Sequence, residues 1–363
     1  MRPSIIIGGG PAGTSAALTL RQSGQPVLLL ERSPGPVDRI CGDFLGAASI
    51  RQAEAFGLDP AALGARPIGR LRLVHRSRIT DSALPFRAYG LSRRLLDEAL
   101  LRRVTEAGAE VLRGQPAGAL RQDGSDLVVR AESIGEIATD SVFLATGRHD
   151  LPGYVRVGQT TTGTAMKIYF RLRRRQHIEM LGHVELILFR GGFASLLPVE
   201  EDRCAMSVLL TRRRQWESWP DLLAWLQADC PPLAERLNGA VPLLEQPLMA
   251  TGLAFGHVHR PRSADHDGLF RLGDQAALIP SLTADGVSIA MRSGVRAAQT
   301  WLTGMGAAEY HRRLRAMLWP RMRFGAMLSG GAGPTDAGDI PAASAPTAAR
   351  PPTMTARWSR LQA

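Results

Sequence analysis

A glycine pattern near the start of the sequence constrains the fold of this chain more than any other feature. The apolar run Ser4 to Ile7 is rich in β-branched residues and leads directly into Gly8-x-Gly10-x-x-Gly13. In this spacing the first glycine permits a tight turn, Gly10 lets the backbone approach a pyrophosphate, and Gly13 lets a helix pack closely on the strand. The N-terminus of that helix then faces the anion. The pattern therefore predicts a strand-turn-helix unit that binds a dinucleotide.

An acidic residue completes this fingerprint. The next apolar run, Val27 to Leu30, ends at Glu31, whose carboxylate is expected to accept a hydrogen bond from a ribose hydroxyl. Arg32 follows it, and Pro11 and Ala12 open the helix, so we expect all three beside the same ligand. A glycine pattern alone is a weak signal, but strand, helix and acid together make chance improbable. They leave open whether the ligand is a nicotinamide cofactor or FAD.

Composition narrows the class of protein. With 363 residues, 45% of them hydrophobic, and no long uncharged apolar run, the chain suits a soluble globular protein with a main core and a second lobe. Three cysteines are too few for a disulfide framework, and the first strand leaves no room for a signal peptide ahead of it, which predicts a cytoplasmic protein. The sequence does not indicate an oligomeric state.

The net charge of +11 comes almost wholly from arginine, because Lys167 is the only lysine. The arginines are scattered along the chain, which argues against binding of nucleic acid. One cluster, Arg312 to Arg323, alternates with apolar residues, so a peripheral contact with an anionic membrane surface stays open.

Periodicity predicts two kinds of architecture. The first part of the chain favours a β-α-β unit over residues 1–31, followed by helices and strands that return to the same sheet: helices at 45–56 and 92–107, and strands at 110–112, 117–120, 127–130 and 141–145. The middle favours an antiparallel sheet with a helical insert: strands at 166–172, 184–189, 194–199 and 204–210, and helices at 216–228 and near Leu233. A buried strand at 269–272 and a helix at 285–302 come next.

A second motif distinguishes between the two candidate cofactors. The strand ending in Gly273-Asp274 lies far from the first fingerprint in sequence and suits FAD much better than NAD, with Asp274 bonded to the ribityl chain and Pro280 beside the isoalloxazine. The helix entered at Asp285-Gly286 would direct its N-terminal amides at the flavin edge where negative charge collects on reduction.

These features predict an α/β protein with a Rossmann-like FAD-binding domain and an interleaved α+β lobe that carries an antiparallel substrate sheet. The predicted FAD-binding domain is discontinuous and comprises residues 1–75, 90–160 and 265–330. The predicted substrate domain comprises residues 76–89 and 161–264. Residues 331–363, rich in Ala, Pro, Thr and Gly, are predicted to form a disordered tail.

With these motifs, the chain resembles the FAD-dependent oxidoreductase superfamily of para-hydroxybenzoate hydroxylase, and more closely its geranylgeranyl-reductase-like branch. The resemblance covers about residues 1–320 and rests on residues 8–13 with Glu31, 39–44, 91–97, 145–148 and 273–286. It implies that Arg93 lies near the pyrophosphate or ribityl chain, that the stretch around Ala117 contacts the adenine, and that Cys41-Gly42 lies close to the flavin ring.

The chain also departs from the hydroxylase pattern. Thr146-Gly147 replaces an Asp-Gly pair associated with FAD and NAD(P)H, Leu278 replaces a histidine, and Ala284 replaces a glycine. These changes weaken the transfer of the hydroxylase mechanism and leave the flavin site, including Thr146 and Gly147, in place.

Few residues qualify for catalysis. Cys41 is a candidate proton donor beside the flavin, against the alternative of a small buried hydrophobe. Lys167 and Tyr169 lie on one face of a predicted strand and either contact substrate or form an exposed sheet face. His257, His259 and His266 are irregularly spaced, which predicts scattered surface histidines and no metal site.

The sequence therefore predicts an FAD-dependent oxidoreductase that acts on a hydrophobic small molecule. It favours a monooxygenase or oxidase that tailors an aromatic or polyketide-type compound in secondary metabolism. The alternative is an alkene reductase of the geranylgeranyl-reductase type, and a third class is a flavin-binding partner protein without turnover. The chain carries no second GxGxxG, so NAD(P)H would bind only transiently as an electron donor.

Overall fold

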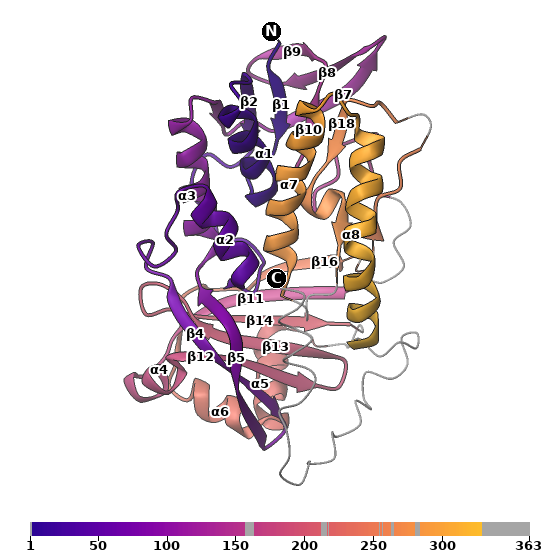
Figure 1. The fold of residues 1–363 in the computed structure, drawn as a ribbon. Coiled ribbons are helices and arrows are strands. Elements are labelled where there is room, and N and C mark those ends of the chain that lie inside the picture. The colour runs from indigo at the N-terminus through magenta and orange to yellow at the C-terminus, as the bar shows by residue number, and fades with distance from the viewer. Residues whose placement is uncertain are drawn as a thin grey trace.

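The computed structural model describes most of the chain (Figure 1). The described residues are 2–156, 163–211, 216, 218–253, 255, 257–262, 265–279 and 284–328, with the end of the last helix described as backbone only. Pro280 and the predicted tail, residues 331–363, lie outside the described residues.

A five-stranded parallel sheet forms the predicted Rossmann-like core. Its strand order is β18-β10-β1-β2-β6. Four of the strands are buried, as expected for a parallel sheet covered on both faces, and the edge strand β6 is exposed or half-buried. Their bounds are β1 Ser4–Ile7, β2 Val27–Glu31, β6 Glu110–Arg113, β10 Val142–Leu144 and β18 Leu269–Arg271. One face is covered by α1 (Pro11–Gln22), α3 (Arg93–Glu106) and α7 (Gly286–Leu302).

A small antiparallel sheet covers the other face. It consists of β7 (Ala117–Asp123), β8 (Asp126–Ala131) and β9 (Gly135–Thr139). Leu120, Leu127 and Val129 from this sheet pack against β1, β2 and β10. The two strands predicted near 117 and 127 thus exist, but they form a separate layer instead of joining the parallel sheet.

The second lobe is built on a nine-stranded sheet with the order β15-β11-β14-β13-β12-β4-β5-β3 and with β16 also paired to β11. Neighbouring strands are antiparallel except for β12 and β4, which are parallel. The bounds are β3 Phe44–Leu45, β4 Arg66–His75, β5 Arg78–Gly90, β11 Gly163–Arg171, β12 Gly182–Phe189, β13 Gly192–Pro198, β14 Cys204–Leu210, β15 Val241–Pro242 and β16 Leu248–Leu253.

Sequence periodicity did not predict the long β4–β5 hairpin, whose side chains are mostly half-buried or exposed. Burial is irregular along β4, and the alternating run of β5 contains Pro85, a residue that disfavours a strand prediction. Residues 66–75, assigned above with the FAD-binding segments, hydrogen-bond within this second sheet through β12. The division into domains otherwise stays a prediction.

Helices cover the far face of the second sheet, and its near face is turned toward the parallel-sheet domain (Figure 1). Leu222, Leu226 and Leu233 pack on that far face from α5 (Trp219–Asp229) and α6 (Pro231–Leu237). Two further helices are α2 (Ala47–Ala55) and the short α4 (Arg174–Met180). The predicted antiparallel lobe with a helical insert is confirmed.

The last described segments follow β18 or flank it. β17 (His257–Val258) and β19 (Ala277–Leu278) form a separate two-stranded antiparallel sheet. The other segments are a 3-10 turn (Gly273–Gln275), α7, and α8 (Ala307–Leu328). In the arginine-rich part of α8, Leu314 and Leu318 are buried against the core while Trp319 is 55% exposed. Among the described helices, none is long and apolar enough to span a membrane.

Candidate active site

The turn between β1 and α1 has the geometry that its glycines predict. Gly8 adopts a φ of 112°. A Cβ on Gly13 would lie 2.0 Å from the carbonyl oxygen of Gly8, so helix and strand approach too closely for any side chain there. A Cβ on Gly10, in contrast, would have one described atom within 4 Å, Arg93 Nη2 at 3.5 Å. Since Gly10 caps α1 without a side-chain hydrogen bond, the first-turn N–H groups can face an anion.

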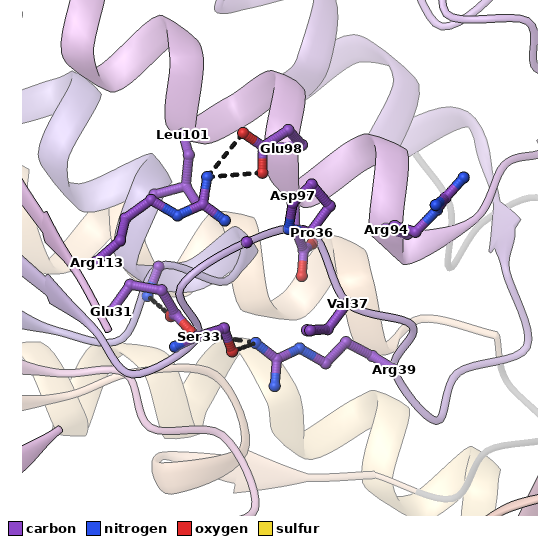
Figure 2. A pocket seen from close by; sticks show the side chains of 12 residues that line it. Glu31, Ser33, Pro36, Val37, Arg39, Arg94, Asp97, Glu98, Leu101 and Arg113 are labelled. Carbon is purple, nitrogen blue, oxygen red and sulfur yellow. Dashed lines mark hydrogen bonds and ion pairs between the residues drawn. The ribbon is translucent and has the colours of Figure 1, made fainter. Parts of the chain in front are cut away.

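Glu31 lies at the end of β2 beside this turn. Its carboxylate accepts hydrogen bonds from the N–H of Gly9 (2.7 Å) and of Ser33 (2.9 Å), and it pairs with Arg39 at 3.2 Å. Burial alone would raise the pKa of Glu31, but these donors outweigh burial and lower it. The Ser33 side chain is a further hydrogen-bond partner of this carboxylate, so a ribose hydroxyl would share an oxygen that already accepts a hydrogen bond. Figure 2 shows the pocket that Glu31, Ser33 and Arg39 line together with α3.

We expect Glu31→Gln to lower the free energy of unfolding by about 2 kcal/mol at pH 7, because charge-assisted hydrogen bonds weaken. The pKa of Glu31 is depressed in the folded protein, so its contribution is present above the ordinary value of 4.5 and is lost as the pH falls through the folded-state value. Urea unfolding of both proteins at pH 7 and pH 3 tests this. A stability difference that stays the same at pH 3 would contradict it.

Two further predicted contacts lie near this pocket. Arg32 is exposed and its Nη2 lies 2.7 Å from His149 Nε2, while Ala117 is half-buried at the start of β7. Neither residue lines the pocket of Figure 2, and their contact with FAD stays a prediction.

The second motif lies next to the first in space. Gly273 has a φ of 53°, a Cβ on it would be 3.2 Å from Ala12, and its N–H donates to Ser293 Oγ at 2.8 Å. Burial raises the pKa of Asp274, and the charges of Arg148 and Arg93 oppose that rise. The fold therefore joins residues 8–13 and 273–274 into one site, as the sequence predicted.

The loop after β10 and the start of α7 complete the surface of the candidate cofactor site. Gln275 Nε2 donates to the carbonyl oxygens of Gly147 (2.8 Å) and His149 (3.1 Å), which fixes the loop after β10. α7 begins at Gly286, and its N-cap Asp285 makes no side-chain hydrogen bond to the backbone of the helix. No described atom lies within 4 Å of a Cβ built on Gly147 or Gly286.

These residues fit FAD. Thr146 Oγ1 is buried and finds no hydrogen-bond partner among the described residues. Because Gly10, Gly147 and Gly286 have no side chains, the backbone there leaves room for a flat ring and a diphosphate. The N-termini of α1 and α7 supply positive potential. When bound, FAD would be held by the α1 N-terminus, Glu31 and the Gly273-Asp274 turn, and it would supply two-electron hydride chemistry.

Arg93 connects this surface to α3. It follows Ser92, whose Oγ accepts the N–H of Leu95 at 3.3 Å as the predicted helix cap. Its guanidinium forms two hydrogen bonds with Asp97, at 2.7 and 2.8 Å. Burial would lower the pKa of Arg93, but Asp97 and, more weakly, Cys41 raise it. Arg93 is thus a fixed cation between the Gly10 turn and Cys41.

Cys41 lies half-buried on the loop between β2 and β3. It packs against the main core, and the charges of Arg93 and Arg148 act on it. A Cβ built on the adjacent Gly42 would lie 4.0 Å from Ser195 Oγ on β13. All three cysteines are free thiols, and Cys204 and Cys230 are buried at 0% and 2% exposure. Cys41 therefore lies where the cofactor cradle and the second sheet meet.

Lys167 and Tyr169 share one face of β11, as predicted, but that face is not exposed. Their exposures are 0% and 1%. Asp43 Oδ2 lies 2.6 Å from Lys167 Nζ and accepts the Tyr169 hydroxyl at 2.8 Å. Both residues are bound to the Cys41 loop, and a contact of either with substrate stays a prediction. Sequence analysis missed Asp43, although it belongs to the 39–44 motif.

The histidines do not all lie at the surface. His257 is buried, so the expectation of scattered surface histidines is wrong for this residue. The described residues contain no group of three or more His, Cys, Asp or Glu side chains that could hold a metal ion.

Comparison with known proteins identifies the family of the chain. Residues 2–301 match the family described as FAD binding domain. Digeranylgeranylglycerophospholipid reductase 2 of Methanopyrus kandleri is 27% identical over 311 residues, which cover 80% of this chain and 74% of that protein. Menaquinone reductase of Mycobacterium tuberculosis is 24% identical over 313 residues, covering 81% and 75%.

Solved structures share the fold. A flavoprotein/dehydrogenase of Cytophaga hutchinsonii aligns with a TM-score of 0.78 at 18% identity, covering 91% of this chain and 86% of that one. The myxobacterial chondrochloren halogenase, an FAD-dependent halogenase, aligns with a TM-score of 0.74 at 20% identity, covering 89% and 81%.

Fold and site together define a flavoprotein whose dinucleotide cradle adjoins a separate antiparallel sheet. The chain belongs to the FAD binding domain family. It is an FAD-dependent oxidoreductase, and its geranylgeranyl-reductase-like resemblance is confirmed by these relatives.

Proposed function

We propose that this protein reduces a carbon–carbon double bond in a hydrophobic substrate. The observation that carries the proposal is the place of Cys41, a half-buried thiol between the cofactor cradle and the second sheet. Reduction of an alkene adds a hydride to one carbon and a proton to the other. The cofactor accounts for the hydride, and the chain must supply the proton.

A thiol is a stronger acid than the hydroxyl of serine or threonine, so Cys41 is a suitable proton donor for a substrate bound beside it. The guanidinium groups of Arg93 and Arg148 lie close enough to Cys41 to interact with it electrostatically. Regeneration of the thiol takes a proton from solvent. Arg93 is itself fixed by Asp97, which keeps this positive charge in place.

The near face of the second sheet supports a hydrophobic substrate. Ser195 and Ser207 are paired across β13 and β14 on the face toward Cys41 and Gly42. Because side chains alternate along a strand, the next residues on this face are apolar. They are Leu186, Leu188, Phe193 and Leu209, most of them half-buried. We propose that this wall binds the substrate.

Oxygen-dependent hydroxylation, which the sequence alone favoured, is the second candidate. Its support is the fold shared with an FAD-dependent halogenase. We place reduction first because the two relatives described above, each matched over about four fifths of this chain, are named as reductases. A flavin-binding partner without turnover has no feature of the site in its favour.

The test is turnover without oxygen. The holoprotein is reduced by NAD(P)H or dithionite under argon, mixed with menaquinone or a digeranylgeranyl phospholipid, and the product is analysed by mass spectrometry. Reduction adds two hydrogens and proceeds equally well without oxygen. A product that gains an oxygen atom, and only in air, would establish hydroxylation instead.

We propose a cytoplasmic protein of secondary metabolism that takes electrons from transiently bound NAD(P)H and does not bind nucleic acid. A peripheral membrane contact would use Arg312, Arg313 and Arg315 of α8, since Leu314 and Leu318 of that helix are buried.

A further inference from the structure

We propose that Lys167 and Ser207 are positioning residues that clamp the segment Arg39 to Asp43 and so determine where Cys41 lies. The proposal deepens the proposed function and rests on it, because Cys41 matters to catalysis only if it donates the proton. The segment Arg39 to Asp43 is called the strap below.

Two side chains of the second sheet bind the backbone of the strap. Lys167 Nζ donates to the carbonyl oxygen of Arg39 at 3.0 Å, and Ser207 Oγ donates to the carbonyl oxygen of Cys41 at 3.0 Å. Lys167 and Ser207 are direct cross-strand neighbours in the β11–β14 pair. The two donors are thus adjacent on the sheet and match two carbonyls that are two residues apart on the strap.

Asp43 anchors the end of the strap. Its Oδ2 binds Lys167 and Tyr169, and its Oδ1 accepts the backbone N–H of Arg93 at 3.2 Å. Asp43 has a φ of 55°, which is unusual for a residue other than glycine and persists only where the surroundings enforce it. Lys167 and Asp43 are both fully buried, so neither charge can leave this arrangement without losing its partner.

The clamp leaves the chemistry of Cys41 free. Both donors bind main-chain oxygens, so they fix the path of the strap without occupying the thiol. The same carboxylate that receives Lys167 also fixes the first residue of α3, which carries the Arg93 guanidinium. The second sheet therefore sets the position of Cys41 relative to both Arg93 and the near face that we propose for substrate.

Thiol labelling measures this positioning directly. Cys204 and Cys230 are buried, so in the folded holoprotein iodoacetamide should alkylate Cys41 first, and peptide mass spectrometry resolves the three sites. We expect Ser207→Ala to change the rate at Cys41 by about fivefold, the factor that corresponds to about 1 kcal/mol for one lost hydrogen bond. Ser207→Thr keeps the hydroxyl donor and should restore the native rate.

Ser195→Ala is the matched control, because Ser195 lies beside Ser207 on the same face and gives the strap no hydrogen bond among those described. The rate at which iodoacetamide alkylates Cys41 in this variant should equal the rate in the native protein. A Ser207→Ala rate equal to that of the native protein or of Ser195→Ala would overturn the proposal. So would a Ser207→Thr rate equal to that of Ser207→Ala.

Lys167→Met provides a second test with the same readout. It should alter the Cys41 rate more than Ser207→Ala does, while FAD affinity, followed by flavin fluorescence, changes less than threefold. A native rate at Cys41 in this variant would count against the clamp. Labelling of Cys204 and Cys230 in Lys167→Met would show that this variant unfolds. The Ser207 and Ser195 variants would then decide whether the clamp exists. These labelling rates do not depend on which reaction the enzyme catalyses, so they can fail or succeed independently of the anaerobic turnover test.

Discussion

Replacing Gly10 by alanine is expected to weaken FAD binding by about 10- to 100-fold while leaving the protein folded. Within the part of the chain that the structure describes, the Cβ would meet only the end of the Arg93 side chain, at 3.5 Å, which is ordinary contact. Gly10 has a φ of −75°, which alanine adopts without strain. The new methyl group instead enters the space over the α1 N-terminus that the pyrophosphate needs, and such overpacking costs about 1–3 kcal/mol. Titration of the apoprotein with FAD, followed by flavin fluorescence, measures the loss.

Gly13→Ala separates binding from folding. Its Cβ would lie 2.0 Å from the carbonyl oxygen of Gly8, so helix α1 must move away from the sheet. We expect this variant to lose thermal stability, in contrast to Gly10→Ala. Gly69→Ala on β4 is the control, since no described atom lies within 4 Å of its Cβ position. Native FAD affinity in Gly10→Ala would contradict the assignment of the diphosphate to this turn.

The parts of this fold that the sequence predicted are those whose signals are local. The glycine spacing, the Ser92 cap and the buried strands each depend on residues close together in the chain, and the structure has them. The pairing of residues 8–13 with Gly273-Asp274 was also predictable, because parallel strands of one sheet present their carboxyl ends at the same edge.

The rest depends on contacts between distant segments. The β4–β5 hairpin gave no clear signal, because the surroundings of β4 are partly solvent and partly β12 and because Pro85 lies within the alternating run of β5. The partners of Lys167 lie on the loop after β2, at Arg39 and Asp43, and no pattern in β11 indicates them. A single lysine in an arginine-rich chain, on an apolar strand, was the available signal for a buried ion pair. Its compact ammonium fits a fully enclosed site where a guanidinium is bulkier.

The largest expected effect is at Cys41. Cys41→Ser should lower the rate of alkene reduction by about 10²- to 10⁴-fold, the usual contribution of a positioned acid or base. A serine hydroxyl is nearly the same size as a thiol but a far weaker acid. The substrate wall and the strap therefore stay in place while the proton donor is removed. FAD affinity and the rate at which NAD(P)H or dithionite reduces the bound flavin should stay native.

The measurement is a single turnover under argon, in which pre-reduced holoprotein is mixed with substrate and flavin reoxidation is followed by absorbance. Ser195→Ala serves as the control, since it changes the same wall without touching the thiol. A native rate of flavin reoxidation in Cys41→Ser would exclude the thiol as the proton source and leave Cys41 as a packing residue. Slow reoxidation in both variants would assign the effect to the shape of the wall. Only loss confined to Cys41→Ser ties the protonation step to this residue, because a serine hydroxyl of nearly the same size is too weak an acid to give up its proton at neutral pH.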